Sequence, residues 1–330
     1  MKDANSPILV TGATGFIGGR LVERLLRDGC AVRILALPGE AIEARWEHAL
    51  EIVRGDIANA AAVRRAVEGT KLVYHLAAVV GDWADWRVYE PVTVEGTRHI
   101  YSAALAQDTQ VVLASSAVIY GHYLVDQVCA EDQPFGKPQG NYSRAKQQQE
   151  RDGHAYTARG LKLTMIRPGN VIGAGCRPWV RDLVREIRRK TPALIDGGKG
   201  NAGLIHVDNL VDLFVRAALP AAIGRAYNAC DEWAVTWAQY MTDIAEVIGM
   251  ETPASIARPL ATITAYGGEA LWWLTGNTTR PPLTREALNL VGANIRMSTT
   301  RARTELGWQP TVTYAQAMAE IGNYIRTQRL

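Results

Sequence analysis

Hydrophobic positions in the first half of the chain alternate between short continuous runs and helical patterns. The short runs predict strands at 8–11, 31–37, 51–54, 71–76, 110–114 and 161–166. Between them, apolar residues recur at helical spacing over 17–26, 60–67 and 92–106, and Gly29 is placed to end the first of these helices. This alternation predicts an α/β protein with a doubly wound parallel sheet that is covered on both faces.

The pattern changes after Pro168. Gly and Pro become frequent and helical patterns predominate, although 226–229 reads as one more strand that returns to the sheet. We therefore expect a first domain at 1–172 with a return segment at about 205–229. A smaller, mostly helical lobe is expected at about 173–204 and 230–330.

Composition narrows the function classes. The 330 residues are 48% hydrophobic and 21% charged with a net charge of +3, which is typical of a soluble globular protein and too weakly basic for nucleic acid. The four cysteines are far apart and the start at 1–7 is polar, so we expect reduced thiols, no signal peptide and a cytoplasmic location. The apolar stretch 259–274 is interrupted by Gly267, Gly268 and Glu269, so we expect no integral membrane segment.

A glycine-rich loop joins the first strand to the first helix. It reads Thr11-Gly12-Ala13-Thr14-Gly15-Phe16-Ile17-Gly18, with glycines spaced GxxGxxG rather than GxGxxG. Glycine lets the backbone turn sharply and approach a pyrophosphate, and the helix N-terminus offers free N–H groups to the anion. A tight structural turn is the alternative reading, but the position in the first βαβ unit favours a Rossmann-type dinucleotide site.

The residues near the end of the second strand leave NAD and NADP open. An acidic residue there binds the ribose of NAD, and an arginine accepts the 2′-phosphate of NADP. The strand ends in Leu35-Ala36-Leu37, which offers neither. Arg33 and Arg45 are candidate phosphate ligands, and Glu40 is a candidate ribose ligand.

Candidate chemistry comes from two segments. Tyr142 and Lys146 are four residues apart on a predicted helix, so both project from one face. An ammonium beside a phenol favours the phenolate, so we expect Lys146 to lower the pKa of Tyr142 from about 10 and make it a general acid/base. Ser115 and Ser116 follow the strand at 110–114, at the sheet edge where doubly wound proteins bind ligands. Each feature alone also fits a surface helix or a turn cap.

Seven ordered motifs carry a family resemblance: TGATGFIG at 11–18, VYHLAA at 73–78, VEGT at 94–97, SSAVIYG at 115–121, YSRAK at 142–146, RPGNVIG at 167–173 and ELGWQP at 305–310. Together they resemble the extended short-chain dehydrogenase/reductase family over nearly the whole chain. The resemblance implies that Ser116, Tyr142 and Lys146 are catalytic and that a nicotinamide dinucleotide is the cofactor. One departure is Thr93, which stands where many members carry asparagine.

The resemblance also implies where the cofactor lies. Asp56 and Ile57 are expected to border the adenine, Ala77 to line the cleft, and Lys146 to contact the nicotinamide ribose. The full expected set of cofactor contacts is Gly12, Thr14, Gly15, Phe16, Ile17, Gly18, Arg33, Asp56, Ile57, Leu76, Ala77, Ala78, Tyr142, Lys146, Pro168, Gly169, Asn170 and Val171. The six histidines show no metal-ligand spacing, so no catalytic metal is expected, and His75 is read as a structural residue.

The substrate class has two readings. The C-terminal segments around Ala270-Leu271-Trp272-Trp273-Leu274 and Pro281-Pro282-Leu283-Thr284-Arg285-Glu286 resemble the 3β-hydroxysteroid dehydrogenase-like branch, which implies an apolar alcohol or ketone. The interval before ELGW lacks the R-x-G-D segment typical of nucleotide-sugar enzymes and offers only Arg296. We therefore expect an oxidoreductase acting on a secondary alcohol or ketone, with a nucleotide-sugar 4-epimerase or dehydratase as the alternative and a non-catalytic dinucleotide sensor as a third class.

Two further expectations concern packing. Trp272 and Trp273, like Trp83 and Trp86, either line the substrate pocket or belong to the core. The family resemblance also implies a homodimer that pairs the helices near 92–107 and 142–158 of each subunit.

Overall fold

A parallel sheet of seven strands forms the centre of the computed structural model, which describes residues 6–46, 48–190, 194–277 and 279–330. The first five residues of the polar N-terminal segment lie outside these ranges. Across the sheet the strands follow the order β3 (Glu51–Arg54), β2 (Val32–Ala36), β1 (Ile8–Thr11), β4 (Leu72–His75), β5 (Gln110–Ala114), β7 (Leu163–Pro168) and β11 (Ala226–Ala229). The order turns at β1, and this reversal is where a doubly wound sheet opens a ligand crevice.

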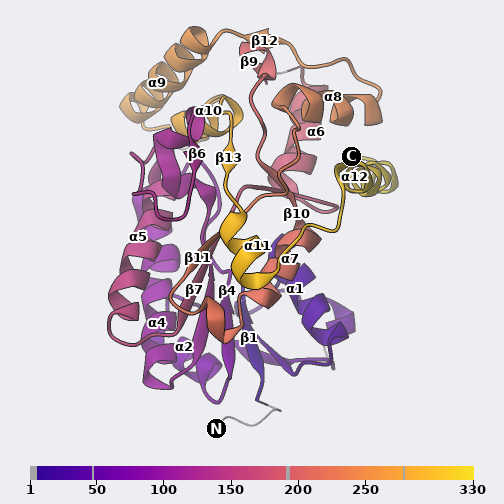
Figure 1. Ribbon diagram of the computed structural model, residues 1–330. Coiled ribbons are helices and arrows are strands. Elements are labelled where there is room, and N and C mark those ends of the chain that lie inside the picture. The colour runs from indigo at the N-terminus through magenta and orange to yellow at the C-terminus, as the bar shows by residue number, and fades with distance from the viewer. Residues whose placement is uncertain (1–5, 47, 191–193, 278) are drawn as a thin grey trace.

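The central strands are short and buried on both faces. Every residue of β1, β4 and β7 is buried, which explains why these segments read as continuous apolar runs. All neighbouring strands pair in parallel, for example Thr11 with His75 in β1 and β4. The carboxyl ends of the strands therefore meet at one edge of the sheet, which is the upper edge in Figure 1.

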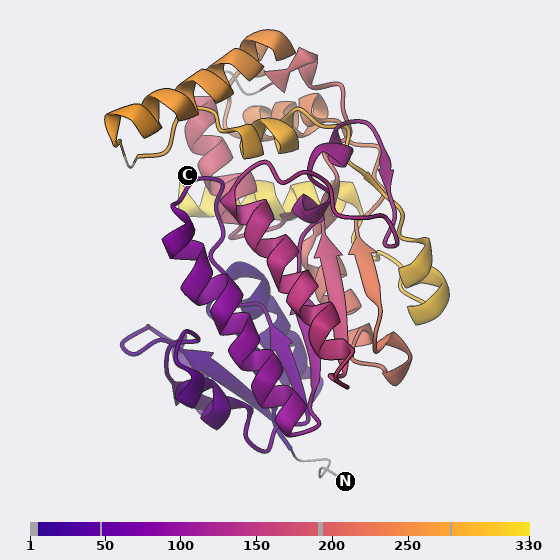
Figure 2. The same ribbon diagram turned by 90° about the vertical axis from the view of Figure 1, so that its left-hand side faces the viewer.

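Helices cover both faces of the sheet (Figures 1 and 2). One face packs against α1 (Phe16–Arg27) and α7 (Val207–Arg216), with the buried Trp308 in the same core. The other face packs against α2 (Ala60–Val67) and α4 (Gly96–Ala106), and α5 (Asn141–Thr157) lies beside α4. The predicted α/β fold with a doubly wound parallel sheet is confirmed.

Most of the C-terminal segments lie above the carboxyl edge of the sheet, whereas residues 300–306 pack against β11 (Figure 1). They and the connecting segments contain α3 (Trp86–Tyr89), α6 (Leu183–Arg188), α8 (Trp237–Val247), α9 (Arg258–Thr275), α10 (Arg285–Val291), α11 (Thr300–Leu306) and α12 (Tyr314–Gln328). Three small parallel pairs link them, namely β8 (Asn170–Ile172) with β10 (Leu204–His206), β9 (Leu194–Ile195) with β12 (Ser255–Ile256), and β6 (Val128–Cys129) with β13 (Arg296–Met297). The sequence did not predict these pairs.

Most predicted elements of the first half are confirmed within two residues at each end. The helix predicted over 92–106 differs, because residues 90–95 form a π-helical turn that leads into α4, and Pro91 stands in its first turn. The helix α9 is unusual in burying only Ala261 and Ala265, while its large apolar side chains, such as Ile263 and Trp273, are exposed. Trp273 is 80% exposed, so the reading of this residue as core is wrong.

Among the described residues, no helix combines the length and the apolar composition that crossing a membrane requires. The division into a nucleotide lobe and a substrate lobe, and the homodimer through the helices near 92–107 and 142–158, stay predictions.

Candidate active site

The glycine-rich loop packs closely against its neighbours. A Cβ on Gly18 would lie 2.0 Å from the carbonyl oxygen of Gly12, and a Cβ on Gly12 would lie 2.8 Å from the backbone nitrogen of Ala77. Gly12 also has a φ of 69°, a conformation that favours glycine. These two glycines therefore let α1 start directly against the end of β1 and beside the segment that follows β4.

The N-terminus of α1 has the features of an anion site. Its N-cap residue, Gly15, makes no side-chain cap, and the first turn carries no acidic residue. Thr14 and Gly15 are exposed, and the first backbone N–H groups of the helix have no partner within the helix. A pyrophosphate fits this end of the helix because backbone N–H groups and the helix dipole both favour an anion there.

Glu40 lies between this loop and the end of β2. Its carboxylate accepts hydrogen bonds from the Thr14 hydroxyl at 2.6 Å and from the backbone nitrogen of Leu37 at 2.9 Å. The structure does not bring Arg33 to the same place, because its guanidinium donates to the Ala66 carbonyl at 2.9 Å and pairs with Glu51. The expectation that Arg33 contacts the cofactor does not fit this geometry, since its side chain leaves the sheet toward the end of α2.

The segments after β3 and β4 border the same edge. Asp56 is exposed and accepts from the backbone nitrogen of Ala58, while Ile57 is buried and lies next to Gly96. The stretch Leu76-Ala77-Ala78 follows β4 directly, and the nitrogen of Ala77 donates to the Thr11 hydroxyl at 3.2 Å. These residues thus follow β3 and β4 at the same edge of the sheet as the glycine-rich loop.

His75, at the end of β4, is a structural residue as expected. It is buried, with Nδ1 bonded to the Thr11 hydroxyl at 2.8 Å and Nε2 bonded to the Thr97 hydroxyl at 2.9 Å. Burial lowers its pKa to about 3, and the nearby Lys146 charge acts in the same direction. The imidazole is therefore neutral at physiological pH and links the end of β1 to α4.

The segment Pro168-Gly169-Asn170-Val171 begins at the last residue of β7 and leads into β8 at the carboxyl edge of the sheet. Gly169 and Val171 are partly exposed, whereas Asn170 is 5% exposed. The amide of Asn170 donates to the Ala202 carbonyl at 2.7 Å. Its side chain is therefore engaged within the protein, and the backbone nitrogens of Gly169 and Asn170 donate to the carbonyls of Ala229 and Gly203.

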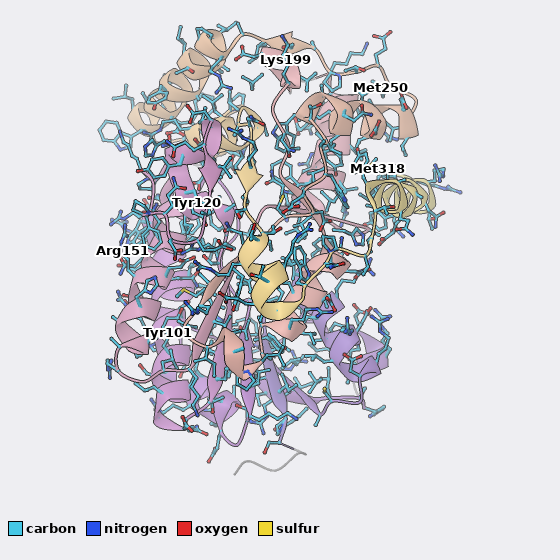
Figure 3. The ribbon with its side chains drawn as sticks, in the orientation of Figure 1. Tyr101, Tyr120, Arg151, Lys199, Met250 and Met318 are labelled. Carbon is cyan, nitrogen blue, oxygen red and sulfur yellow. The ribbon has the colours of Figure 1, made fainter. Side chains whose placement is uncertain are left out.

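The two serines that follow β5 have different partners in the structure. The Ser115 hydroxyl donates to the Glu150 carboxylate at 2.5 Å, so it belongs to a buried network that includes the ion pair of Glu150 with Arg167. The Ser116 hydroxyl instead accepts a hydrogen bond from the backbone nitrogen of Val118, and its side chain lies near enough to the phenol of Tyr142 to lower the pKa of that phenol. The structure therefore brings Ser116, not Ser115, to the predicted tyrosine. The buried network of Ser115, Glu150 and Arg167 continues to Tyr120, which is labelled in Figure 3. The Tyr120 hydroxyl donates a hydrogen bond to the side chain of Asn228 at 2.7 Å.

Tyr142 stands in the first turn of α5, against a small apolar cluster that includes Val79, Trp86 and Tyr89. Burial raises its pKa to about 12, the Ser116 side chain acts in the opposite direction, and the charge of Glu286 raises it further. The expected net lowering of this pKa is wrong for this arrangement, because the cost of burying the phenolate is the largest effect. The phenol is consequently protonated at neutral pH.

Lys146 lies one turn further along α5 and is 3% exposed. Its ammonium donates to the carbonyl of Ala114, the last residue of β5, at 2.9 Å. Burial lowers the pKa of Lys146 to about 8, and the charge of Glu150 acts against this shift. The lysine is therefore still largely charged at neutral pH, at the end of the strand that leads to Ser116.

Glu286 is a residue that the sequence did not single out. It comes from α10, is 2% exposed, and accepts a hydrogen bond from the backbone nitrogen of Ser143 at 2.8 Å. The only signal in the sequence is that Glu286 stands two positions after Thr284, the residue that caps α10. An acidic residue in the first turn is common to many helices and does not by itself indicate a functional carboxylate.

One acidic cluster outside the crevice was also missed by sequence spacing. His206, Asp208 and Glu320 present ligand atoms that lie within 4.8 Å of one another. Arg20 pairs with both Asp208 and Glu320, so a cation already occupies this group. We assign it a structural role that ties α12 to α1.

Fold and site together define a nicotinamide-dinucleotide-dependent enzyme with a Rossmann-type sheet. A model of the family described as "NAD dependent epimerase/dehydratase family" matches residues 8–230. The chain belongs to this family, which confirms the predicted resemblance to extended short-chain dehydrogenases/reductases.

Curated relatives match the chain over almost its full length. A 4-hydroxy-2-methyl-3-oxo-4-farnesyl-3,4-dihydroquinoline-1-oxide ketoreductase of Stigmatella aurantiaca is 26% identical, covering 94% of this chain and 93% of the relative. A 3-beta-hydroxysteroid dehydrogenase of Mycolicibacterium neoaurum is 27% identical, covering 95% of this chain and 89% of the relative. The resemblance to 3β-hydroxysteroid dehydrogenases is thus confirmed at the level of relatives.

A solved structure supports the fold. The UDP-glucuronic acid 4-epimerase of Bacillus cereus, in complex with UDP-glucuronic acid and NAD, superposes with a TM-score of 0.75 at 18% identity, covering 98% of this chain and 99% of that one. At this identity the similarity concerns the fold alone.

Proposed function

We propose that the protein interconverts a secondary alcohol and a ketone on a largely apolar substrate, with Ser116, Tyr142 and Lys146 as its catalytic residues. The observation that carries this proposal is the closeness of the Ser116 side chain to the Tyr142 phenol, with the buried Lys146 one helical turn away. Ser116 follows β5 at the carboxyl edge of the sheet, and Tyr142 and Lys146 lie on α5.

The chemistry follows from the state of the phenol. When bound, the dinucleotide supplies or accepts the hydride. Because Tyr142 is protonated at neutral pH, it is ready to donate a proton to a carbonyl oxygen as the carbon is reduced. The Ser116 hydroxyl holds that oxygen against the phenol. The Lys146 ammonium provides positive charge that stabilises the phenolate left after proton transfer. In the oxidative direction the same phenolate takes the hydroxyl proton.

An apolar substrate fits the surroundings of Tyr142. Its ring packs among Val79, Ala84, Trp86 and Tyr89, so an apolar wall adjoins the reacting hydroxyl. The apolar side chains of α9 are exposed rather than buried in a core, which leaves them available to a substrate. The ketoreductase and hydroxysteroid dehydrogenase activities of the two relatives support the same substrate class.

The alternative is a 4-epimerase or dehydratase acting on a nucleotide sugar. The fold of a solved UDP-glucuronic acid 4-epimerase supports this alternative. Against it, Arg296 lies at the surface and donates to the carbonyl of Asp126, and Arg280 is paired with Asp82. Both arginines are already engaged, so neither is a ready partner for a diphosphate.

A substrate panel tests the proposal. Purified protein is assayed with NAD and NADP, and with their reduced forms, against steroids, alkyl ketones and alcohols, UDP-sugars and TDP-sugars. We expect net oxidation or reduction of the cofactor with an apolar ketone or alcohol. Conversion of a nucleotide sugar without net cofactor change would favour the epimerase instead. Dinucleotide binding without turnover of any compound would favour a sensor.

A further inference from the structure

A carboxylate from a distant part of the chain sits on the helix that carries Tyr142. Glu286, in the first turn of α10, accepts a hydrogen bond through Oε1 from the backbone nitrogen of Ser143 at 2.8 Å. The Tyr142 backbone beside it lowers the pKa of the carboxylate. Glu286 is 2% exposed, so this contact is sealed from solvent.

The contact replaces a missing cap. The N-cap residue of α5 is Gly140, which has no side chain to bind the free N–H groups of the first turn. Glu286 takes that role from outside the helix. A Cβ on residue 140 would lie 2.2 Å from Oε2 of Glu286, so glycine at this position leaves room for the carboxylate. The first turn of α5 and the start of α10 are thus fitted to each other.

The second oxygen has an unusual environment. Oε2 is buried and has no hydrogen-bond partner among the described residues. The charged and titratable groups around it are Asp82, which is paired with Arg280 and accepts from Thr284, and the phenols of Tyr89 and Tyr142. An anion here therefore faces two phenols and a second carboxylate, and a buried anion without full pairing is costly.

We propose that Glu286 is a positioning residue that holds the first turn of α5 from the C-terminal segment and controls the ionisation of Tyr142. The inference rests on the proposed function, because it takes Tyr142 as the group that transfers the proton. Burial raises the pKa of Glu286 to about 8, and the charge of Asp82 acts in the same direction. Below that pH Glu286 is a neutral acid. Above it, the carboxylate opposes formation of the Tyr142 phenolate.

The pH dependence of alcohol oxidation tests this proposal, because oxidation requires the phenolate. Glu286→Gln keeps a carbonyl oxygen for Ser143 but cannot ionise. We expect kcat/KM of E286Q to match the wild type below about pH 8 and to exceed it above that pH. A change of about half a pKa unit in Tyr142 makes this difference about threefold. Glu269→Gln is the control, because Glu269 lies on α9 and pairs with Arg285 at the start of α10.

A ratio of E286Q to wild-type kcat/KM that stays constant from pH 6 to 10 would overturn the proposal, since a purely structural residue leaves the pH profile unchanged. Tyr142→Phe separates this result from failure of the proposed function. If Y142F keeps its turnover, the assignment of Tyr142 is wrong. If Y142F is inactive and the ratio is constant, only the inference about Glu286 fails.

A pair of glycine variants provides a second test that does not need E286Q to fold. In Gly140→Ala the new methyl group displaces the Glu286 carboxylate, and we expect kcat to fall roughly tenfold or more while the Kd for NAD is unchanged. The control is Gly267→Ala on α9, where a Cβ meets no atom within 4 Å. Wild-type kcat in G140A would contradict the positioning role.

Discussion

The ammonium of Lys146 donates to the main-chain carbonyl of Ala114 at 2.9 Å, which fixes the lysine at the end of the strand that leads to Ser116. Under the proposed function, this buried cation stabilises the Tyr142 phenolate. Lys146→Met removes the charge and keeps much of the side-chain volume. We expect a loss of kcat of about a hundredfold or more, measured by cofactor absorbance. Lys162→Met, at an exposed lysine paired with Asp108, is the control and is expected to keep wild-type kcat.

The pH profile of K146M adds a second check on the same residue. The pKa of Lys146 is lowered to about 8, so its charge is lost as the pH rises through that value. The rate of ketone reduction by the wild type should therefore decline above about pH 8, because Lys146 loses its charge there. This decline should be absent in K146M, which has no ionisable group at residue 146. An unchanged decline in the variant would mean that another group titrates.

The contact between Gly18 and Gly12 predicts a strict requirement for glycine at residue 18. A Cβ there would lie 2.0 Å from a carbonyl oxygen, so Gly18→Ala must push α1 away from β1. We expect the Kd for NAD to rise more than tenfold, roughly, because the N–H groups of the helix N-terminus move. Gly19→Ala is the neighbouring control, since its Cβ would meet atoms only at 3.5 Å and beyond. Equal affinity for NAD in G18A and G19A would rule out this role.

The place of Glu40 predicts a preference for NAD. Its carboxylate bonds to Thr14 of the glycine-rich loop and to Leu37 at the end of β2, where a 2′-phosphate would meet like charge. Glu40→Gln should raise the ratio of kcat/KM with NADP to that with NAD by roughly tenfold. Glu43→Gln, at an exposed glutamate paired with Arg45, should leave the ratio unchanged. If E40Q behaves as E43Q does, cofactor choice is set elsewhere.

The pair of His206 with Glu320 predicts a contribution to acid stability. The hydrogen bond from His206 at 2.8 Å lowers the pKa of Glu320 to about 2, and the charge of Arg20 acts in the same direction. A carboxyl group with a lowered pKa stabilises the fold above its unfolded pKa, and this contribution is lost as pH falls toward 2. Glu320→Gln should lower Tm by several degrees at pH 7 and much less near pH 3.

Glu246→Gln is the control for that measurement, because Glu246 is exposed on α8. An equal Tm for E320Q and wild type at pH 7 would show that the pair adds nothing to stability.

Much of the fold was predictable because its strands are buried on both faces. Such strands appear in a sequence as short apolar runs, and the runs at 8–11 and 226–229 matched β1 and β11. The small pairs such as β9 with β12 were not predictable. They are two residues long, so they leave no pattern, and their partners are distant in the chain.

The candidate site was predictable where spacing along one element fixes geometry. Tyr142 and Lys146 lie on one helix, so their separation follows from helical periodicity. Contacts between distant segments were not accessible in this way. Glu286 reaches Ser143 across 143 residues, and Arg33 leaves the cofactor edge because its partners lie at the end of α2. The pKa of Tyr142 was also beyond the sequence, because it depends on burial.

Paired measurements on Tyr142→Phe test the central claim most directly. Turnover with an active ketone is measured by cofactor absorbance, and NAD binding is measured by titration of the same preparation. Removing one hydroxyl from the phenol should reduce kcat by a hundredfold or more, roughly, while the Kd for NAD stays within about twofold of wild type. Wild-type turnover, or an equal loss of turnover and NAD binding, would contradict the assignment of Tyr142 as the proton donor.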